Sequence, residues 1–129
     1  MTPIETVQAF YRALGAGDVP AALGLLAPDI QWTETPHFPY YSGTWTTPQM
    51  VLDRLLVPAS QDWKGFAANA TRFITSGAEV VALGAYGGLN RATGKTLDAG
   101  FAHIWRVEDG RITRFDQYTD TQAVRLAMA

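Results

Sequence analysis

Residues 101–120, FAHIWRVEDGRITRFDQYTD, decide the expected fold, because apolar and polar side chains alternate on both sides of Asp109-Gly110. Such alternation predicts strands, and this dipeptide favours the tight turn of a β-hairpin. Similar turn residues stand upstream at Ser76-Gly77 and Ala92-Thr93-Gly94. We therefore predict four consecutive antiparallel strands after Trp63.

The alternation also predicts which side chains of this hairpin face the core. Phe101, His103 and Trp105 share one face of their strand, and Phe115 and Gln117 share one face of the next. Three of these five side chains are aromatic, so the face is expected to be buried.

The first quarter of the chain predicts two helices. Thr2-Pro3-Ile4-Glu5 has the form of a capping box with proline at the first helical position, and apolar residues then recur at helical spacing. Gly15 and Gly17 end this helix. Asp18 is expected to cap a second helix whose apolar stripe runs through Leu26, with Pro28 just beyond its end.

A strand and a third helix are expected next. From Asp29 the pattern alternates, with Ile30, Trp32 and Glu34 on one side, until Pro36 interrupts it. Thr47-Pro48 opens a helix that is expected to end before Pro58, with residues 58–62 as a loop, and Asp120 is expected to cap a last short helix. Helices segregated from an antiparallel meander define an α+β fold.

Composition limits the function classes. At 129 residues the chain is expected to be one domain, residues 1–129, and its net charge of −2 shows no basic stripe for nucleic acid or membranes. It has no cysteine, no glycine-rich phosphate loop and no dinucleotide fingerprint, so we expect no cofactor. Glu34-x-x-His37 has no third ligand at a suggestive spacing, so no metal is expected. Without a signal segment or a membrane span, a cytoplasmic protein is expected.

The order of elements, with FYRALGAGDVPAALGLLAPDIQWTE at the front and FAHIWRVEDGRITRFDQYTD at the back, resembles the superfamily of ketosteroid isomerases and SnoaL-like polyketide cyclases. The resemblance covers essentially the whole chain. It implies the cone-shaped α+β fold of nuclear transport factor two, in which three N-terminal helices pack on a curved antiparallel sheet around a cavity. Members include isomerases, cyclases, dehydratases, epoxide hydrolases and non-catalytic binding proteins, so membership alone chooses no function.

The resemblance also implies candidate catalytic positions. The general base of ketosteroid isomerases lies near the end of the first strand, at Glu34 by counting from Asp29 or at Thr35 by counting from Pro36, and strand alternation favours Glu34. His103 stands where these isomerases carry an acidic oxyanion donor. The second donor position falls on Tyr11 or, in another alignment, on Phe10.

The position of the acid/base aspartate in SnoaL-like cyclases falls on Gln117, which takes no proton, and the adjacent Asp116 is expected to face away from Phe115 and Gln117. Candidate ligand-binding residues are the aromatic and polar side chains expected around the cavity: Trp32, His37, Tyr40, Phe101, Trp105, Phe115 and Gln117.

From the residues themselves, a carboxylate among aromatic side chains is desolvated and acquires a raised pKa, which suits a general base. The preferred hypothesis is a small cofactor-independent enzyme that binds an apolar, carbonyl-bearing cyclic molecule and moves a proton, with Glu34 as base and His103 and Tyr11 as oxyanion donors. The alternatives are a non-catalytic domain that binds a hydrophobic small molecule, and an interaction module whose cone is filled by side chains. Apolar residues on the outer sheet face, Ile104 and Tyr118, predict a homodimer.

Overall fold

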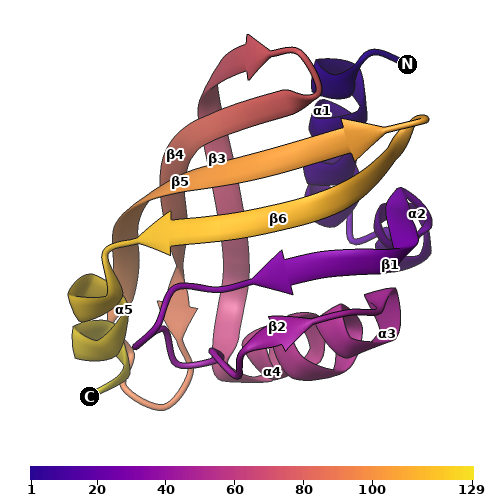
Figure 1. The fold of residues 1–129 in the computed structure, drawn as a ribbon. Helices are drawn as coiled ribbons and strands as arrows, with labels where there is room; N and C mark the ends of the chain where they lie inside the picture. The colour runs from indigo at the N-terminus through magenta and orange to yellow at the C-terminus, as the bar shows by residue number, and fades with distance from the viewer.

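The computed structural model describes all residues, 1–129, in which helices pack against a curved sheet (Figure 1). Its elements follow in the order α1 (Pro3–Gly15), α2 (Val19–Gly24), β1 (Leu26–Thr33), β2 (Thr44–Trp45), α3 (Pro48–Val51), the π-helical turn η1 (Leu52–Leu56), α4 (Val57–Asp62), β3 (Trp63–Ser76), β4 (Glu79–Asn90), β5 (Thr96–Glu108), β6 (Arg111–Thr119) and α5 (Thr121–Met128).

The six strands form one sheet in the order β2-β1-β6-β5-β4-β3. The four strands from β3 to β6 are the predicted antiparallel meander, and Asp109 and Gly110 in its last turn both have positive φ, at 52° and 73°. Such angles are those of the turn that matches the twist of a hairpin. The observed sheet departs from the predicted antiparallel sheet in one place, because β1 lies parallel to β6.

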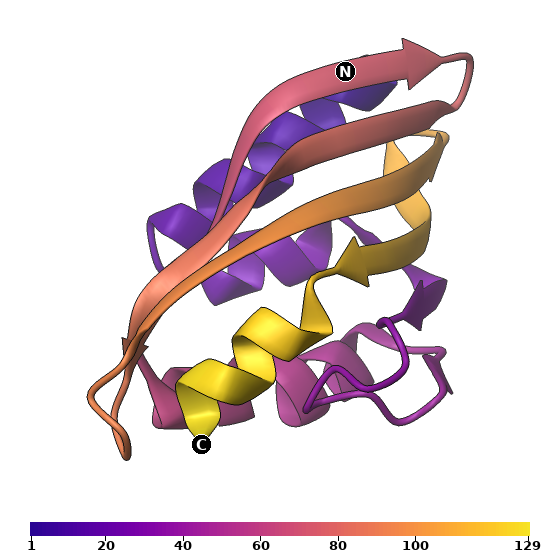
Figure 2. The same cartoon turned by 90° about the vertical axis from the view of Figure 1, so that its left-hand side faces the viewer.

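Helix α1 begins where its capping box predicts. The Thr2 hydroxyl accepts a hydrogen bond from the Glu5 backbone N–H at 3.3 Å, and Glu5 Oε1 accepts one from the Thr2 N–H at 2.9 Å. Figures 1 and 2 show α1 on the concave side of the bent strands β3 and β4, and α5 beyond the end of β6. The concave face therefore holds the core, and the convex face is open to solvent.

The boundary between the second helix and the first strand is not where the sequence predicts it. Helix α2 ends at Gly24 and Leu26 already lies in β1, which contains Pro28. The Leu25 carbonyl accepts a hydrogen bond from the Ile112 N–H of β6 at 2.9 Å. Pairing with β6 thus draws Leu26 into the sheet, an interaction that local helical spacing does not reveal.

The predicted loop at residues 58–62 is also wrong, because these residues continue the third helix as α4. Proline lacks an N–H, and its ring collides with the carbonyl four residues earlier in a regular α-helix. Here the preceding turn widens to π-helical spacing, with the Val57 N–H donating to the Leu52 carbonyl, so that Pro58 enters without ending the helix.

Two irregularities help the sheet to bend around α1. The pairing of β3 with β4 shifts between Lys64 and Ala67 and again between Ala70 and Arg72, and bulges of this kind bend a strand. Gly84 of β4 lies beside the second shift, where an added Cβ would come within 2.0 Å of the Asn69 carbonyl oxygen. Only glycine allows this close approach of the two backbones.

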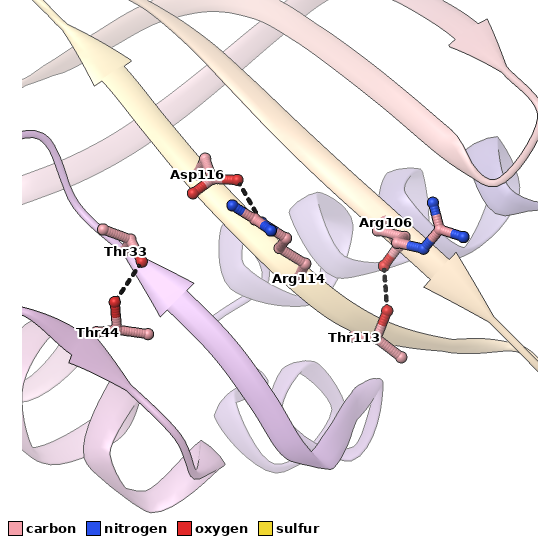
Figure 3. Close-up of polar contacts among 6 residues, drawn as sticks. All are labelled: Thr33, Thr44, Arg106, Thr113, Arg114 and Asp116. Carbon is pink, nitrogen blue, oxygen red and sulfur yellow. Dashed lines mark hydrogen bonds and ion pairs between the residues drawn. The ribbon is translucent and has the colours of Figure 1, made fainter.

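Polar side chains contact one another on the convex face (Figure 3). The Arg114 Nε donates to Asp116 Oδ2 at 2.8 Å, and the Thr33 and Thr44 hydroxyls lie 2.9 Å apart. Tyr118 is exposed at 57%, whereas Ile104 is only partly exposed. The homodimer stays a prediction, and a monomer in light scattering at micromolar concentration would remove it. None of the helices has the length and apolar character needed to cross a lipid bilayer.

Candidate functional site

Three polar side chains lie in the aromatic interior of the concave face. Glu34 is 2% exposed, and His103 and Gln117 are each 3% exposed. Glu34 directly follows β1, His103 lies in β5 and Gln117 in β6, so three strand segments that neighbour one another in the sheet supply them. His103 and Gln117 are cross-strand partners in register.

Glu34 is the buried acid of this interior. Its Oε1 accepts a hydrogen bond from Trp32 Nε1 at 3.1 Å, whereas its Oε2 is buried without a partner. Removal from water disfavours the charged carboxylate and outweighs the Trp32 hydrogen bond, so burial raises the pKa of Glu34 from 4.5 to about 8. An acid of this kind exchanges its proton near neutral pH.

His103 is held at both ring nitrogens. Its Nδ1 lies 2.5 Å from the Tyr11 hydroxyl and its Nε2 lies 2.6 Å from the Tyr86 hydroxyl. Burial lowers the pKa of His103 to about 3, so the ring is neutral at ordinary pH. Because both nitrogens face protein hydroxyls, neither is left to donate to a bound molecule in this arrangement.

Two further donors complete the hydrogen-bonded chain around His103. Trp105 Nε1 donates to the Tyr11 hydroxyl at 3.0 Å. At the other end, Gln117 Nε2 donates to the Tyr86 hydroxyl at 2.7 Å, because Gln117 Oε1 already accepts the backbone N–H of Thr35 at 3.0 Å. This backbone contact fixes the orientation of the amide, since an N–H can only donate.

The structure separates the two pairs of positions that sequence alignment left open. Thr35 is a partner of Gln117, to which it also donates its hydroxyl at 2.6 Å, whereas Glu34 is the residue buried among the aromatic rings. Phe10 packs as a core ring against Trp105 at 5.2 Å, whereas Tyr11 brings a hydroxyl to His103.

Aromatic side chains occupy the interior beside Glu34. The Trp32 and Phe115 ring centroids are 3.9 Å apart, and Trp105 lies 4.5 Å from Phe115. Phe101 stacks on the His103 ring at 3.9 Å. Trp32, Trp105 and Phe115 are therefore in mutual contact, and Phe101 lies beside them through the His103 ring.

Two other predicted binding residues lie elsewhere. His37 is exposed and lines a surface hollow of about 470 Å³ against α5, where its carbonyl accepts a hydrogen bond from Arg125 at 2.6 Å. The Tyr40 hydroxyl donates to Asp62 at 2.7 Å, at the junction of α4 and β3. A second hollow, of about 750 Å³, lies beside the β5–β6 turn, and neither hollow is lined by Glu34 or His103.

Sequence reasoning missed Tyr86, and it noted Phe38 beside Glu34 without including it among the candidate binding residues. Tyr86 is 5% exposed and shares the buried face of β4 with Val80 and Ala82, a period of two that marks it as inward-facing. Its pairing with His103 depends on tertiary packing. Phe38 is 2% exposed and lies 6.2 Å from the Tyr86 ring, in a turn closed by hydrogen bonds that no strand or helix pattern signals.

Asp116 lies on the other side of the sheet. As alternation predicts, it faces the convex side, where it pairs with Arg114 (Figure 3). A carboxylate in that place does not reach the interior, and β6 presents the amide of Gln117 there instead. No group of three or more His, Cys, Asp or Glu side chains stands close enough to hold a metal ion.

The interior can thus supply an acid/base group and hydroxyl hydrogens. Glu34 offers a carboxyl oxygen without a partner, and the chain around His103 offers two tyrosine hydroxyls. Proton transfer next to a carbonyl needs both kinds of group, because the oxygen gains negative charge when the carbon loses its proton.

Comparisons with known proteins show which families and structures this chain resembles. A family model described as a SnoaL-like domain matches residues 7–115. No curated protein matches the sequence. Among solved structures, an NTF2-like protein from Burkholderia thailandensis is 33% identical, with a TM-score of 0.95, over 100% of this chain and 98% of that chain.

Two more distant structures share the fold. TerC, co-crystallised with polyporic acid, is 24% identical, with a TM-score of 0.86, over 98% of this chain and 97% of its own. IdmH from Streptomyces antibioticus, assigned provisionally to the polyketide cyclases, is 17% identical, with a TM-score of 0.85, over 99% of each chain.

Proposed function

The chain belongs to the SnoaL-like domain family, and from its buried acid we propose that it is a cofactor-independent enzyme that moves a proton next to a carbonyl group, with Glu34 as the general base. The observation that carries this proposal is the Glu34 carboxyl, which is fully buried with one oxygen bound by Trp32 and the other without a partner. Buried polar atoms in native proteins are nearly always paired, so an orphaned oxygen calls for a functional explanation.

The strength of Glu34 as a base follows from its surroundings. A pKa of about 8 makes the carboxylate a stronger base than an exposed glutamate, because the aromatic interior does not solvate its charge. At pH 7 about a tenth of the molecules carry the charged form, so proton abstraction accelerates as the pH rises toward 8.

The negative charge that develops on the substrate oxygen requires hydrogen-bond donors. The sequence hypothesis gave this role to His103 together with Tyr11. Because both nitrogens of His103 are engaged, we assign the donor role to the tyrosine hydroxyls and give His103 the task of holding them. Trp32, Phe101, Trp105 and Phe115 supply apolar surface for a cyclic molecule.

Access to Glu34 requires movement, because the interior is closed by side chains. Phe38 covers the ring of Tyr86 from the segment between β1 and β2. Two backbone hydrogen bonds hold its turn, from Phe38 N–H to the Thr35 carbonyl and from Tyr41 N–H to the Phe38 carbonyl. Displacement of this turn admits a ligand without changing the sheet.

The second candidate is a non-catalytic domain that binds a hydrophobic small molecule, and the same closed aromatic interior favours it. In that case Glu34 would only orient a ligand hydroxyl. The mutual packing of Trp32, Trp105 and Phe115 is also what a filled interaction module requires. Ligand binding separates that third class from the first two.

The experiment is hydrogen–deuterium exchange at the α-carbon of a panel of cyclic ketones in deuterated buffer, with polyporic acid as an added binding probe. The wild type is compared with Glu34→Gln and with Glu79→Gln, a surface control at the exposed start of β4. We expect exchange in the wild type and the control, about tenfold faster per pH unit up to about 8, and at least 100-fold slower in Glu34→Gln.

Exchange that survives in Glu34→Gln would overturn the assignment of the base. If no variant shows exchange but a ligand raises the melting temperature, the enzyme hypothesis is wrong and the protein is a non-catalytic binding domain. Neither exchange nor binding would leave the interaction module as the better account.

A further inference from the structure

The hydrogen-bonded chain around His103 holds more hydrogens than it can use. Its four contacts join Trp105 to Tyr11, Tyr11 to His103, His103 to Tyr86 and Tyr86 to Gln117. Trp105 and Gln117 each donate one hydrogen, each tyrosine hydroxyl carries one, and the neutral imidazole carries one on a single nitrogen. Five hydrogens serve four contacts, so one hydroxyl hydrogen is surplus.

The tautomer of His103 decides where the surplus hydrogen resides. If Nε2 carries the ring hydrogen, it donates to Tyr86, Tyr11 donates to Nδ1, and the Tyr86 hydrogen is surplus. If Nδ1 carries it, the roles reverse and the Tyr11 hydrogen is surplus. Passing from one arrangement to the other needs proton exchange with solvent water: one ring nitrogen releases a proton to water and the other takes one from water, while each tyrosine keeps and rotates its own hydrogen. The net charge is the same in both.

Glu34 lies at the Tyr86 end of this chain. It precedes Thr35, whose backbone N–H holds Gln117, and Gln117 in turn holds the Tyr86 hydroxyl. The negative charge of Glu34 contributes to the raised pKa of Tyr86, after the larger effect of burial. A charged carboxylate therefore attracts the surplus hydrogen to Tyr86.

The neutral acid has the opposite effect. Because Glu34 Oε1 already faces the Trp32 N–H, its proton resides on Oε2, the oxygen without a partner. A neutral carboxyl no longer attracts the Tyr86 hydrogen, which favours a Tyr86 hydroxyl that is turned to His103.

We propose that His103 is a positioning residue whose tautomer selects the hydroxyl offered to a bound molecule: that of Tyr86 when Glu34 is charged, and that of Tyr11 when Glu34 is neutral. The role of this selection in catalysis rests on the proposed function. When Glu34 removes a substrate proton it becomes neutral, and the Tyr11 hydroxyl then donates its hydrogen to the negatively charged substrate oxygen. The geometry of the selection requires no substrate.

The titratable groups that face one another here are Glu34 after β1, Tyr11 of α1, Tyr86 of β4 and His103 of β5. The aromatic and amide side chains that pack against them are uncharged: Phe10 of α1, Trp32 of β1, Phe38 between β1 and β2, Phe66 and Phe73 of β3, Phe101 and Trp105 of β5, and Phe115 and Gln117 of β6. Burial raises the pKa of both tyrosines and lowers that of His103, so Glu34 alone titrates between about pH 6 and 9.5.

The test is nitrogen-15 NMR of the His103 ring in the full-length protein without ligand, because a protonated and an unprotonated ring nitrogen have well separated shifts. We expect Nδ1–H near pH 6 and Nε2–H near pH 9.5, with a midpoint near 8. In Glu34→Gln the amide N–H group replaces Oε2, so Nδ1–H should persist at both pH values. Tyr86→Phe should abolish the response, and Tyr118→Phe on the exposed face should retain it.

One tautomer throughout in the wild type, or a doubly protonated ring at pH 6, would overturn the proposal. Amide spectra establish that each variant is folded, and His103→Gln gives a second readout if Tyr86→Phe is not. We expect His103→Gln to lower the rate of ketone exchange without altering its pH midpoint, because Glu34 still titrates. Absence of ketone exchange with a tautomer switch intact would count against the function alone.

Discussion

Glu34 and Asp116 are carboxylic acids on neighbouring strand segments, but the sheet places them on opposite faces. Asp116 is opposite Thr33 in the register of β6 with β1, one residue from Glu34. Its side chain is 23% exposed and pairs with Arg114, whereas Glu34 is 2% exposed and has no cation. One step along a strand therefore separates an ordinary surface acid from an acid with the pKa of a general base.

The largest expected effect is on the pH dependence of stability. The folded protein binds the Glu34 proton more tightly than the unfolded chain does, so its contribution to stability is fully present below about pH 4.5 and is lost as the pH rises through 8. The full loss is roughly 5 kcal/mol. Denaturant unfolding of the wild type and Glu34→Gln at several pH values measures it.

Glu34→Gln should accordingly become the more stable protein as the pH rises, with the gap widening between about pH 5 and 8. A gap that is independent of pH would show that Glu34 is not desolvated in the folded protein.

The next effect concerns the bend of β3 and β4, which gives the sheet its concave and convex faces. In Gly84→Ala the new methyl group meets the Asn69 carbonyl, and the backbones of β3 and β4 must separate, which we expect to cost about 3 kcal/mol. Gly100→Ala is the matched control, because its nearest atom lies 4.0 Å away. Thermal unfolding of the two variants side by side checks this, and equal melting temperatures would count against the close approach.

The smallest effect belongs to the outward acid. Asp116→Asn removes one exposed ion pair, and we expect a loss of less than about 1 kcal/mol that shrinks as salt is added. The rate of ketone exchange should stay that of the wild type. A large loss of exchange in Asp116→Asn would place the acid/base group on the wrong face and contradict the comparison.

Much of the assignment of side chains to the concave and convex faces of the sheet follows from the sequence. Period-two alternation placed Ile30, Trp32 and Glu34 inward and turned Asp116 away from Gln117, and the Asp109-Gly110 turn predicted the hairpin. Such local rules succeed because a one-residue slip would move a whole strand face into water.

The failures have a common cause in tertiary contact. Leu26 joins the strand because β6 pairs with it, and Pro58 enters a helix because the preceding turn widens. The engagement of both His103 nitrogens depends on Tyr11 of α1 and Tyr86 of β4, which lie far apart along the chain. No spacing rule brings such residues together, so the sequence predicted His103 and Tyr11 as donors but did not reveal that Tyr11 and Tyr86 engage both nitrogens of the ring.

The most direct measurement is the titration of Glu34 itself, followed through the carbon-13 signal of its side-chain carboxyl, with Glu34→Gln to assign the resonance. The account predicts a midpoint near pH 8, because the carboxyl is buried with a single hydrogen bond from Trp32. A midpoint near 4.5, that of an ordinary glutamate, would contradict it and remove the base from the proposed reaction.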